Sequence, residues 1–545
     1  MFDLVIKNGK VFTGAGNPWF VSDIAVKNGV ITEIGKISKD AETVIEAKGL
    51  AVAPGVIDLH DHSDYTILVN REAVSKVHMG VSTTVFASCG SGAAPLNEEM
   101  RDEIKRHSPF LMASGVDVTW SSMDEYLSFL ESDGLSINVA PLVGFGTVRK
   151  YVMGMEMRAP TPQELDSMKH QLGLAMKAGC RGITTGLRYD PQSYATTEEV
   201  IELSKVAAQY GGFYTSHVRD EGDRGDPVAA IEEIIRISRE ANIPVNISHF
   251  KILSKRFMDL CPELIKMVND ARDEGLQVTA DQYPYNASGT GLGAWIPKWA
   301  NEGGSEELVK RLNTSEVYKM IKEGLAVSME DRGGPEAALI SSFPLDGSLV
   351  GLNLAQVADM RKQEPLECSL ELLKDHVEAV LSGRIKGGFS IVNFNQTEEN
   401  IQLIMRQPWV AFGTDGRVHS PTGVLNKDIP APHPRFYGTF PRVLGRYVRE
   451  KNVITLEDAV RKMTSLPAQI LSLRDRGILA PGNQADIVVF DHDTVIDRSD
   501  FVPPESTKLF PEGILHLVVN GEITLYDKEH TGARAGKVLR TPVAP

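Results

Sequence analysis

The strongest constraint on the fold is a repeated alternation of apolar strands and amphipathic helices that begins after Pro54. Thr161-Pro-Gln-Glu164 predicts a helix start, because Thr161 and Glu164 form a capping box and proline fits the first helical position. A second helix is expected to begin near Thr196, and a third over 227–241. Strands are predicted between them, at 182–187, 213–217 and 244–250. Strand–helix units of this length connect parallel strands.

The length of this repeating region favours a closed barrel. Roughly 350 to 400 residues of strand–helix units suit a (β/α)8 TIM-like barrel with insertions better than an open sheet. We therefore predict an α/β fold with the barrel at 56–476. Residues at about 290–350, which include Trp295 and Trp299, interrupt the alternation and are interpreted as an inserted lid-like segment. A long loop without function is the alternative.

The two ends of the chain share a different pattern, in which short strands are joined by tight turns. Asn8-Gly9, Asn28-Gly29 and Asn520-Gly521 are typical of hairpins, because both residue types tolerate the positive φ of a tight turn. Residues 1–55 and 477–545 are therefore predicted to pair into one small β-sandwich beside the barrel. The final residues are expected to form a trailing arm.

Composition excludes several classes of partner. A net charge of −15 and an isoelectric point near 5.4 argue against a surface for nucleic acid or anionic membranes. No uncharged apolar run approaches ~20 residues, so no membrane span is expected. The N-terminus lacks the pattern of a secretory signal. Four widely spaced cysteines indicate free thiols, and hence a cytoplasmic protein. The expected partner is a small molecule, and a homo-oligomer is compatible with the sequence.

Two histidines locate a candidate metal site. In Asp58-Leu-His-Asp-His62, His60 and His62 lie two residues apart at the end of a predicted strand. Side chains at this spacing point the same way along a strand, so both imidazoles can enter one space and bind a divalent metal. Taken alone, His-x-His more often means two unrelated polar residues in a loop. The pair therefore needs partners elsewhere in the chain.

Ligand-type side chains end several other predicted barrel strands. They are Cys89, His217, His249 and Asp415. Barrel enzymes carry their chemistry at the carboxyl ends of the strands, so these side chains should converge. A lone histidine or cysteine would more often be structural. The shared position at strand ends favours a metal site, and the ligand types suit Zn²⁺.

These strand ends, with the closing segment 479–490, resemble the amidohydrolase superfamily. Finer motifs are similar to those of D-aminoacylases, the N-acyl-D-amino-acid deacylases. They are Thr185-Gly-Leu-Arg-Tyr189, Ser216-His-Val-Arg-Asp-Glu221, Asp281-Gln-Tyr-Pro-Tyr285 and His433-Pro-Arg-Phe-Tyr-Gly-Thr-Phe-Pro-Arg442. The resemblance covers nearly the whole chain. It implies zinc-dependent hydrolysis of N-acyl-D-amino acids to a carboxylate and a free D-amino acid. Selectivity for the D form rests on the resemblance alone.

The resemblance also implies how the metal is bound. Cys89, His217 and His249 would hold a tight Zn²⁺, and His60 and His62 would form a second, weaker or empty position. Many members of the superfamily instead bridge two metals with a carbamylated lysine on the fourth strand. The predicted strand at 182–187 contains no lysine, which favours the cysteine-type site.

Amide hydrolysis needs a nucleophile, a polarised carbonyl and a proton for the departing amine. Zinc can supply the first two. Asp415 is the candidate general base that takes the proton of water and returns it to the amine nitrogen. Arg435 can bind the substrate carboxylate bidentately. The resemblance implies that four further residues assist at that carboxylate: Lys251, Tyr283, Ser288 and Tyr189.

Simpler interpretations exist for several of these residues. Asp415 suits a turn after a strand, and Arg435 suits an ion pair between domains. His419 and His433 are expected to be exposed loop histidines, and the alternative is that they are additional site residues. Alternative functions are hydrolysis of a cyclic amide, a carbamoyl group or a xenobiotic amide, deamination of a nucleobase, and a non-enzymatic scaffold. A substrate panel separates the enzymes, and a metal-free protein with a reactive Cys89 would support the scaffold.

Overall fold

Eight parallel strand positions form a (β/α)8 barrel in the computed structural model, which describes residues 1–222, 225–502 and 504–541. The third position is interrupted at Pro141, so that two short strands, β8 and β9, occupy it. The strands are β6 (Val56–Asp58), β7 (Val81–Val85), β8 (Asn138–Ala140), β9 (Val143–Gly144), β10 (Gly182–Gly186), β11 (Phe213–His217), β12 (Val245–Ile247), β13 (Val278–Gln282) and β17 (Val410–Phe412). The predicted fold class is confirmed.

The first and last strands meet just beyond their carboxyl ends. Asp61 pairs in parallel with Gly416, and the backbone N–H of Asp415 donates to the carbonyl oxygen of His60 at 2.8 Å. A buried cluster below this seam reinforces it, with Lys76 Nζ at 2.8 Å from Asp58 Oδ2 and 2.7 Å from the Thr414 hydroxyl. The contact brings the His-x-His segment against the segment that carries Asp415.

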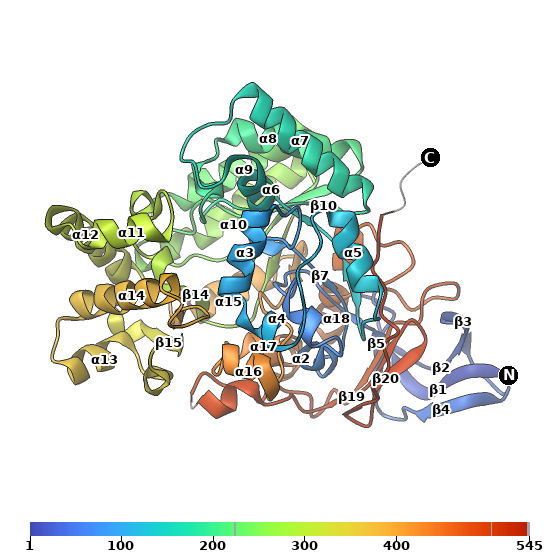
Figure 1. The fold of residues 1–545 in the computed structure, drawn as a ribbon. Helices are drawn as coiled ribbons and strands as arrows, with labels where there is room; N and C mark the ends of the chain where they lie inside the picture. Colours follow the sequence, from blue (N-terminus) through green and yellow to red (C-terminus); the bar gives the residue numbers. More distant parts are fainter. Residues whose placement is uncertain (223–224, 503, 542–545) are drawn as a thin grey trace.

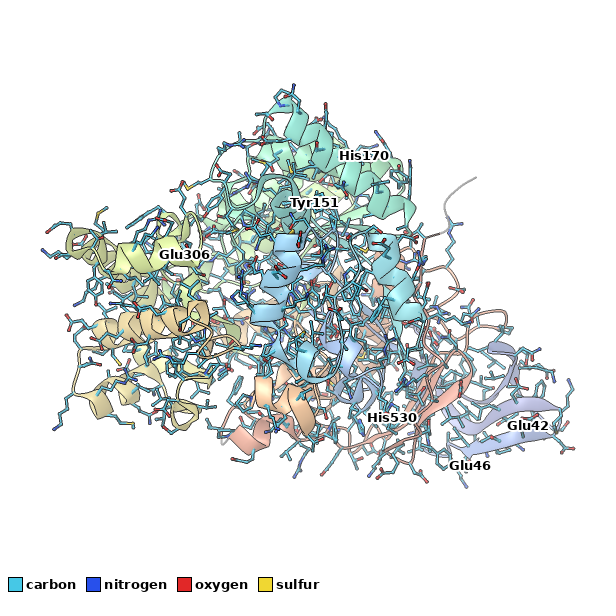
Figure 2. All side chains as sticks on the ribbon, viewed as in Figure 1. Glu42, Glu46, Tyr151, His170, Glu306 and His530 are labelled. Atoms are coloured by element: carbon cyan, nitrogen blue, oxygen red, sulfur yellow. The ribbon has the colours of Figure 1, made fainter. Side chains whose placement is uncertain are left out.

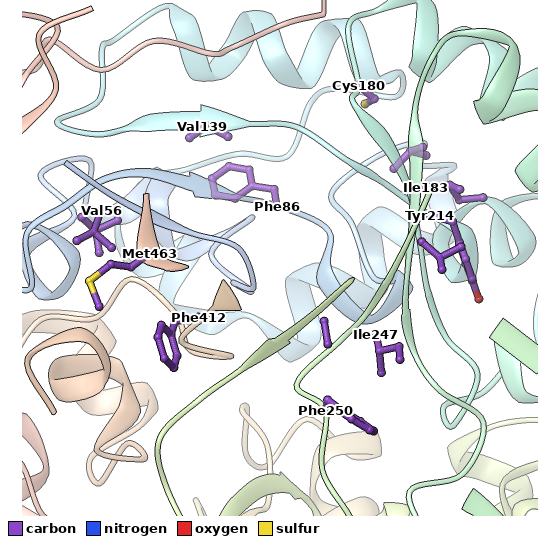
Figure 3. Close-up of a cluster of buried hydrophobic side chains, with 14 of the residues drawn as sticks. Val56, Phe86, Val139, Cys180, Ile183, Tyr214, Ile247, Phe250, Phe412 and Met463 are labelled. Atoms are coloured by element: carbon purple, nitrogen blue, oxygen red, sulfur yellow. The ribbon is translucent and has the colours of Figure 1, made fainter. Parts of the chain in front are cut away.

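Helices cover the outside of the barrel, and neighbouring helices pack along its circumference (Figure 1). They are α5 (Met123–Glu131), α7 (Pro162–Lys177), α8 (Thr197–Gln209), α9 (Pro227–Ala241), α10 (Cys261–Asp273), α15 (Glu398–Met405) and α18 (Leu456–Met463). The predicted capping box of Thr161 and Glu164 is present, and Thr196 caps α8. Apolar side chains such as Ile183, Ile247 and Phe412 fill the barrel region (Figure 3).

Both ends of the chain contribute to one nine-stranded sheet, in which β5 pairs with β18. This is the predicted pairing of the termini. The strands are β1 (Phe2–Val11), β2 (Phe20–Lys27), β3 (Val30–Gly35), β4 (Ala41–Glu46), β5 (Ala51–Pro54), β18 (Ile487–Phe490), β19 (Ile514–Val519), β20 (Glu522–Tyr526) and β21 (Glu529–His530).

One predicted hairpin is wrong. Asn8-Gly9 lies inside β1, where the pairing with β2 shifts register, so it forms a bulge. Asn8 has the positive φ of 60° that suggested a turn, but the strand continues beyond it. Glycine is required at position 9 because a Cβ there would collide with Val52 of β5. Asn28-Gly29 and Asn520-Gly521 do join consecutive strands, β2 to β3 and β19 to β20.

An inserted unit with its own core lies between β13 and β17. Its antiparallel sheet comprises β14 (Ser288–Gly291), β15 (Ala338–Ser342) and β16 (Ser390–Asn393). Its helices include α11 (Ser305–Leu312), α12 (Ser315–Asp331), α13 (Leu354–Arg361) and α14 (Pro365–Leu381). The unit extends beyond the predicted range 290–350, because α13 and α14 pack on its core. Figure 2 places its Glu306 and Glu42 of the nine-stranded sheet on opposite sides of the molecule.

The C-terminal segment crosses the barrel beside β8. Gly536 pairs with Leu135, and Val538 pairs with Val139. Residues 542–545 of the predicted arm lie outside the described residues. In the part of the chain that the structure describes, no helix is long and apolar enough to cross a membrane.

Candidate metal centre and active site

Three predicted ligands converge above the carboxyl ends of the barrel strands. Cys89 Sγ lies 3.7 Å from His217 Nδ1 and 3.5 Å from His249 Nε2, and all three side chains are buried. Around a tetrahedral zinc ion, with bonds of about 2.3 Å to sulfur and 2.0 Å to nitrogen, a sulfur and a nitrogen ligand are separated by about 3.6 Å. The observed separations therefore fit one zinc ion bound by a thiolate and two imidazoles.

The backbone turns sharply at these strand ends. Cys89, His249 and Asp415 all have positive φ, at 53°, 35° and 46°. Such conformations are uncommon outside glycine and cost of order 1 kcal/mol or more each. Backbone hydrogen bonds fix two of them, from His249 N to Asp281 Oδ1 and from Asp415 N to the His60 carbonyl, both at 2.8 Å.

His60 and His62 lie beside this cluster. His60 Nε2 is 3.4 Å from Cys89 Sγ, and His62 Nε2 is 3.1 Å from Asp415 Oδ1. His60, His62 and Cys89 form one group of donor atoms within 4.8 Å of one another, and His60, His249 and Asp415 form another. The predicted second position is therefore adjacent to the first, and Cys89 borders both.

The surroundings of Cys89 favour the thiolate form of its side chain. Burial by itself would raise its pKa, but His60 and His249 hold the pKa of Cys89 well below its ordinary value. The other free cysteines behave differently: burial raises the pKa of Cys261 to about 12. Because the thiolate is the form that binds metals, Cys89 has the chemistry that the candidate zinc site requires.

Asp415 is an ionised carboxylate next to the metal ligands. Its Oδ2 lies 2.8 Å from Nη1 of Arg435. Burial opposes ionisation, but the charges of Arg435 and His249 hold the pKa of Asp415 well below its ordinary value. An ionised carboxylate can accept a proton, so the geometry is compatible with a general base. It also shows that Arg435 has an ion-pair partner before any substrate binds.

A cavity of about 370 Å³ opens over the cluster. All of the predicted site residues except the fully buried His60 line it. Strands β14, β15 and β16 of the inserted unit also contribute, through residues such as Thr290, Ser341 and Ile391. Among the described lining residues, arginine and lysine side chains outnumber carboxylates: Arg188, Lys251, Arg332, Arg417 and Arg435 accompany Glu221 and Asp415. This balance favours an anionic small molecule.

The side chains predicted to assist at a substrate carboxylate are gathered in this cavity. The guanidinium of Arg435 lies 4.7 Å from the ring centre of Tyr283, whose hydroxyl accepts from Gln396 at 3.0 Å. Ser288 is buried on β14 and donates to Asn395 at 3.2 Å. Tyr189 packs edge-on against His217, with ring centres 4.9 Å apart.

Sequence reasoning missed Glu221 as a site residue. Its carboxylate is buried and lies 2.5 Å from Lys251 Nζ, 3.2 Å from His249 Nδ1 and 3.3 Å from His217 Nε2. Burial would raise its pKa, but His217 and Lys251 keep the pKa of Glu221 well below its ordinary value. Glu221 ends a motif of the D-aminoacylase resemblance, which was the only signal that could have identified it.

Two histidines predicted to be exposed are buried. His419 is 2% exposed and His433 is 4% exposed. His419 bonds to Tyr437 of helix α17 (Arg435–Arg442). His433 lies in the cavity wall beside Arg435, whose backbone N–H donates to its Nδ1. The polar sequence around them suggested a surface loop, but their ring nitrogens are satisfied by backbone and side-chain partners inside the protein.

Comparisons with known proteins agree with this geometry. Residues 347–525 match the family described as Amidohydrolase family. The chain is 32% identical to D-aminoacylase of Alcaligenes xylosoxydans xylosoxydans, over 100% of this chain and 98% of that protein. It is also 32% identical to N-acyl-D-glutamate deacylase of the same organism, over 99% and 96% of the two chains.

Solved structures give the same result. A crystal structure of D-aminoacylase superposes with a TM-score of 0.81 at 31% identity, over 99% of this chain and 100% of that one. N-acyl-D-glutamate deacylase from Bordetella bronchiseptica, complexed with zinc and a phosphonate inhibitor, gives 0.81 at 30% identity, over 99% of each chain. The chain therefore belongs to the amidohydrolase family. Within that family, its full-length similarity is to the D-aminoacylases, which confirms the predicted resemblance.

Proposed function

We propose that this protein is a zinc-dependent deacylase that hydrolyses N-acyl-D-amino acids to a carboxylate and a free D-amino acid. The observation that carries the proposal is the zinc-compatible cluster of Cys89, His217 and His249 with the Asp415 carboxylate beside it. The full-length relatives named D-aminoacylase and N-acyl-D-glutamate deacylase support the linear amide and the D configuration.

Zinc, when bound, supplies a Lewis acid that polarises the scissile carbonyl and lowers the pKa of water. Asp415 then has two tasks. It takes the proton of the attacking water and later delivers that proton to the nitrogen of the departing amine. His62, 3.1 Å from Asp415 Oδ1, orients the carboxylate. The largely buried position of Asp415 strengthens its contacts with His62 and Arg435, because charges interact more strongly away from water.

The substrate carboxylate is assigned to the cationic side of the cavity. Arg435 presents a planar guanidinium that can bind a carboxylate through two parallel hydrogen bonds. Lys251, Tyr283, Ser288 and Tyr189 complete this binding site. Anchoring one end of the substrate fixes the scissile carbonyl beside Asp415. The inserted sheet forms part of the same wall, and we assign it a role in shaping the substrate pocket.

The proposed metal content is one tight zinc at Cys89, His217 and His249, with a weaker second position at His60 and His62. A solved D-aminoacylase is described as having a binuclear centre with one-metal activation and second-metal attenuation. Strand β10 contains no lysine, so it has no residue that could form the carbamylated bridge between two metals found in many relatives. A reducing cytoplasm is the proposed location, because the Cys89 thiol must stay unoxidised.

The proposal is tested by a substrate panel run on protein of measured zinc content. The panel contains N-acetyl-D-amino and N-acetyl-L-amino acids, hydantoins, dihydroorotate and nucleobases. We expect turnover confined to N-acetyl-D-amino acids, with at least one tightly retained zinc ion per chain. Preferential turnover of a cyclic amide, or full activity in protein stripped of metal, would refute it.

A further inference from the structure

We infer that Glu221 is a positioning residue that links the tight metal site to the substrate-carboxylate site through a single carboxylate group. The inference rests on the proposed function. Glu221 Oε2 lies 3.3 Å from His217 Nε2, while Oε1 lies 3.2 Å from His249 Nδ1 and 2.5 Å from Lys251 Nζ. One side chain therefore contacts two candidate zinc ligands and one candidate substrate ligand.

The two histidines present opposite nitrogens to Cys89 and to Glu221. His217 directs Nδ1 toward Cys89 and Nε2 toward Glu221, and His249 does the reverse. A neutral imidazole has one N–H and one free lone pair. A carboxylate that accepts the N–H on the far side leaves the lone pair toward the metal and fixes the ring. Glu221 can serve both rings, because each of its oxygens faces one of them.

Because of Lys251, the hydrogen bonds around His249 depend on whether the metal is bound. Its Nζ lies 2.6 Å from His249 Nδ1 as well as 2.5 Å from Glu221. If Nδ1 accepts from the ammonium, the ring proton must be on Nε2, the nitrogen that faces Cys89. Metal binding at Nε2 requires the proton on Nδ1, which then donates to Glu221. One N–H of Lys251 is thereby released for a carboxylate in the cavity, which Lys251 lines.

The consequence is that Glu221 couples zinc affinity to recognition of the substrate carboxylate. Asp281→Asn offers a control, because Asp281 Oδ1 makes a comparable contact of 3.3 Å to Nδ1 of His60. Asparagine removes that charge but keeps the oxygen that accepts from the backbone N–H of His249. Lys251→Met offers a second control, because it removes the ammonium while leaving Glu221 beside both histidines.

The test compares Glu221→Gln, Asp281→Asn, Lys251→Met and the double variant Glu221→Gln/Lys251→Met. Zinc per chain is measured after equilibration with graded dipicolinate. The preference for a free carboxylate is measured as the ratio of kcat/KM for an N-acetyl-D-amino acid to that for its carboxamide. Glu221→Gln should release zinc at about 10- to 100-fold lower chelator concentration, and should lose most of the preference.

Lys251→Met should lose the preference and keep its zinc, and Asp281→Asn should keep the preference. The double variant removes both charges of the buried pair, so zinc release remains measurable if Glu221→Gln alone does not fold. Retention of zinc at the wild-type level in the Glu221 variants, or an unchanged preference in Glu221→Gln, would overturn the inference. Absence of N-acetyl-D-amino acid turnover in the wild type would instead refute the proposed function and leave the zinc measurement standing.

Discussion

Asp415 has an uncommon backbone conformation, and its carboxylate contacts two other residues of the candidate site. Its φ of 46° directs the carboxylate toward His62 and Arg435. Asparagine is the natural probe, because it tolerates positive φ almost as well as any residue other than glycine and keeps the shape of the side chain. What it removes is the negative charge and the capacity to take up a proton.

We expect Asp415→Asn to reduce kcat by about 10²- to 10⁴-fold, because proton transfer to and from the substrate would lose its carrier. The tightly held zinc should be unchanged, since Cys89, His217 and His249 are intact. Steady-state kinetics and elemental analysis on the same preparation check this. A variant that retains more than a tenth of the wild-type kcat would contradict the assigned role.

Arg435 lowers the pKa of Asp415, so removing its charge changes the pH dependence of the reaction. In Arg435→Met, the effect of burial loses its largest counterweight and the pKa of Asp415 rises. The base must be ionised to act. As the pH is lowered, the variant should therefore lose activity at a higher pH than the wild type does. The acid limb of kcat/KM is expected to move upward by about 1 to 3 pH units.

Arg435→Lys is the matched control for this shift, because it keeps a positive charge near Asp415 but loses the bidentate geometry. It should preserve the acid limb and weaken the preference for a free carboxylate over a carboxamide. An acid limb that stays in place in Arg435→Met would show that Arg435 does not control the ionisation of Asp415.

At the level of single residues, strand-end position predicts which side chains gather at the candidate metal centre. Cys89, His217 and His249 each follow an apolar strand, and the barrel brings the ends of those strands together. Glu221 could not be predicted in the same way, because it lies in the loop after β11 and its sequence context is a polar run. Only folding reveals that Glu221 is buried against two histidines.

Single elements explain where sequence patterns failed. Asn8-Gly9 suits a hairpin and a bulge equally well, because both need a residue with positive φ. The choice depends on the partner strands β2 and β5, which no local pattern records. His419 similarly lies among residues typical of loops, yet it bonds to two helices, α16 (Gly423–Asp428) and α17 (Arg435–Arg442).

The buried ring of His419 is neutral in the folded protein. Its Nε2 lies 3.1 Å from the carbonyl oxygens of Leu425 and Ile429, and Nδ1 lies 2.7 Å from the Tyr437 hydroxyl. Burial lowers the pKa of His419 to about 4. The unfolded chain, with a pKa near 6.5, binds more protons between these two values, so stability falls as pH drops from about 6.5 to 4.

At pH 5 this difference amounts to about 2 kcal/mol relative to neutral pH. We expect His419→Gln, which keeps a donor but does not titrate, to lose correspondingly less stability between pH 7 and pH 5. Urea unfolding of both proteins at the two pH values measures the difference. Equal losses in the two proteins would show that His419 is not the group responsible.

At the scale of the whole molecule, the C-terminal segment packs along the barrel beside β8, where Gly536 pairs with Leu135 and Val538 with Val139. A Cβ at Gly536 would collide with the carbonyl group of Ile137. Gly536→Ala should therefore destabilise the protein by about 1 to 3 kcal/mol, because the segment must move away from the barrel. Gly347→Ala is the control, because nothing lies within 4 Å of its Cβ position and its φ is not positive.

Thermal unfolding monitored by circular dichroism distinguishes the two substitutions. A lower Tm for Gly536→Ala and an unchanged Tm for Gly347→Ala are expected. If Gly536→Ala unfolds like the wild type, the segment does not contribute to the stability of the barrel. Zinc content should be the same in both variants, since the metal ligands are at the opposite ends of the strands.

The pairing of β5 with β18 has a consequence for how the protein is made. Translation proceeds from the N-terminus, so β1 to β5 emerge from the ribosome about 430 residues before β18 does. At synthesis rates of about 5 to 20 residues per second, the edge of β5 waits roughly 20 to 90 seconds for its partner. During that interval the edge of β5 presents unpaired backbone groups, so we expect the nascent chain to be most exposed to pairing with other chains along this strand.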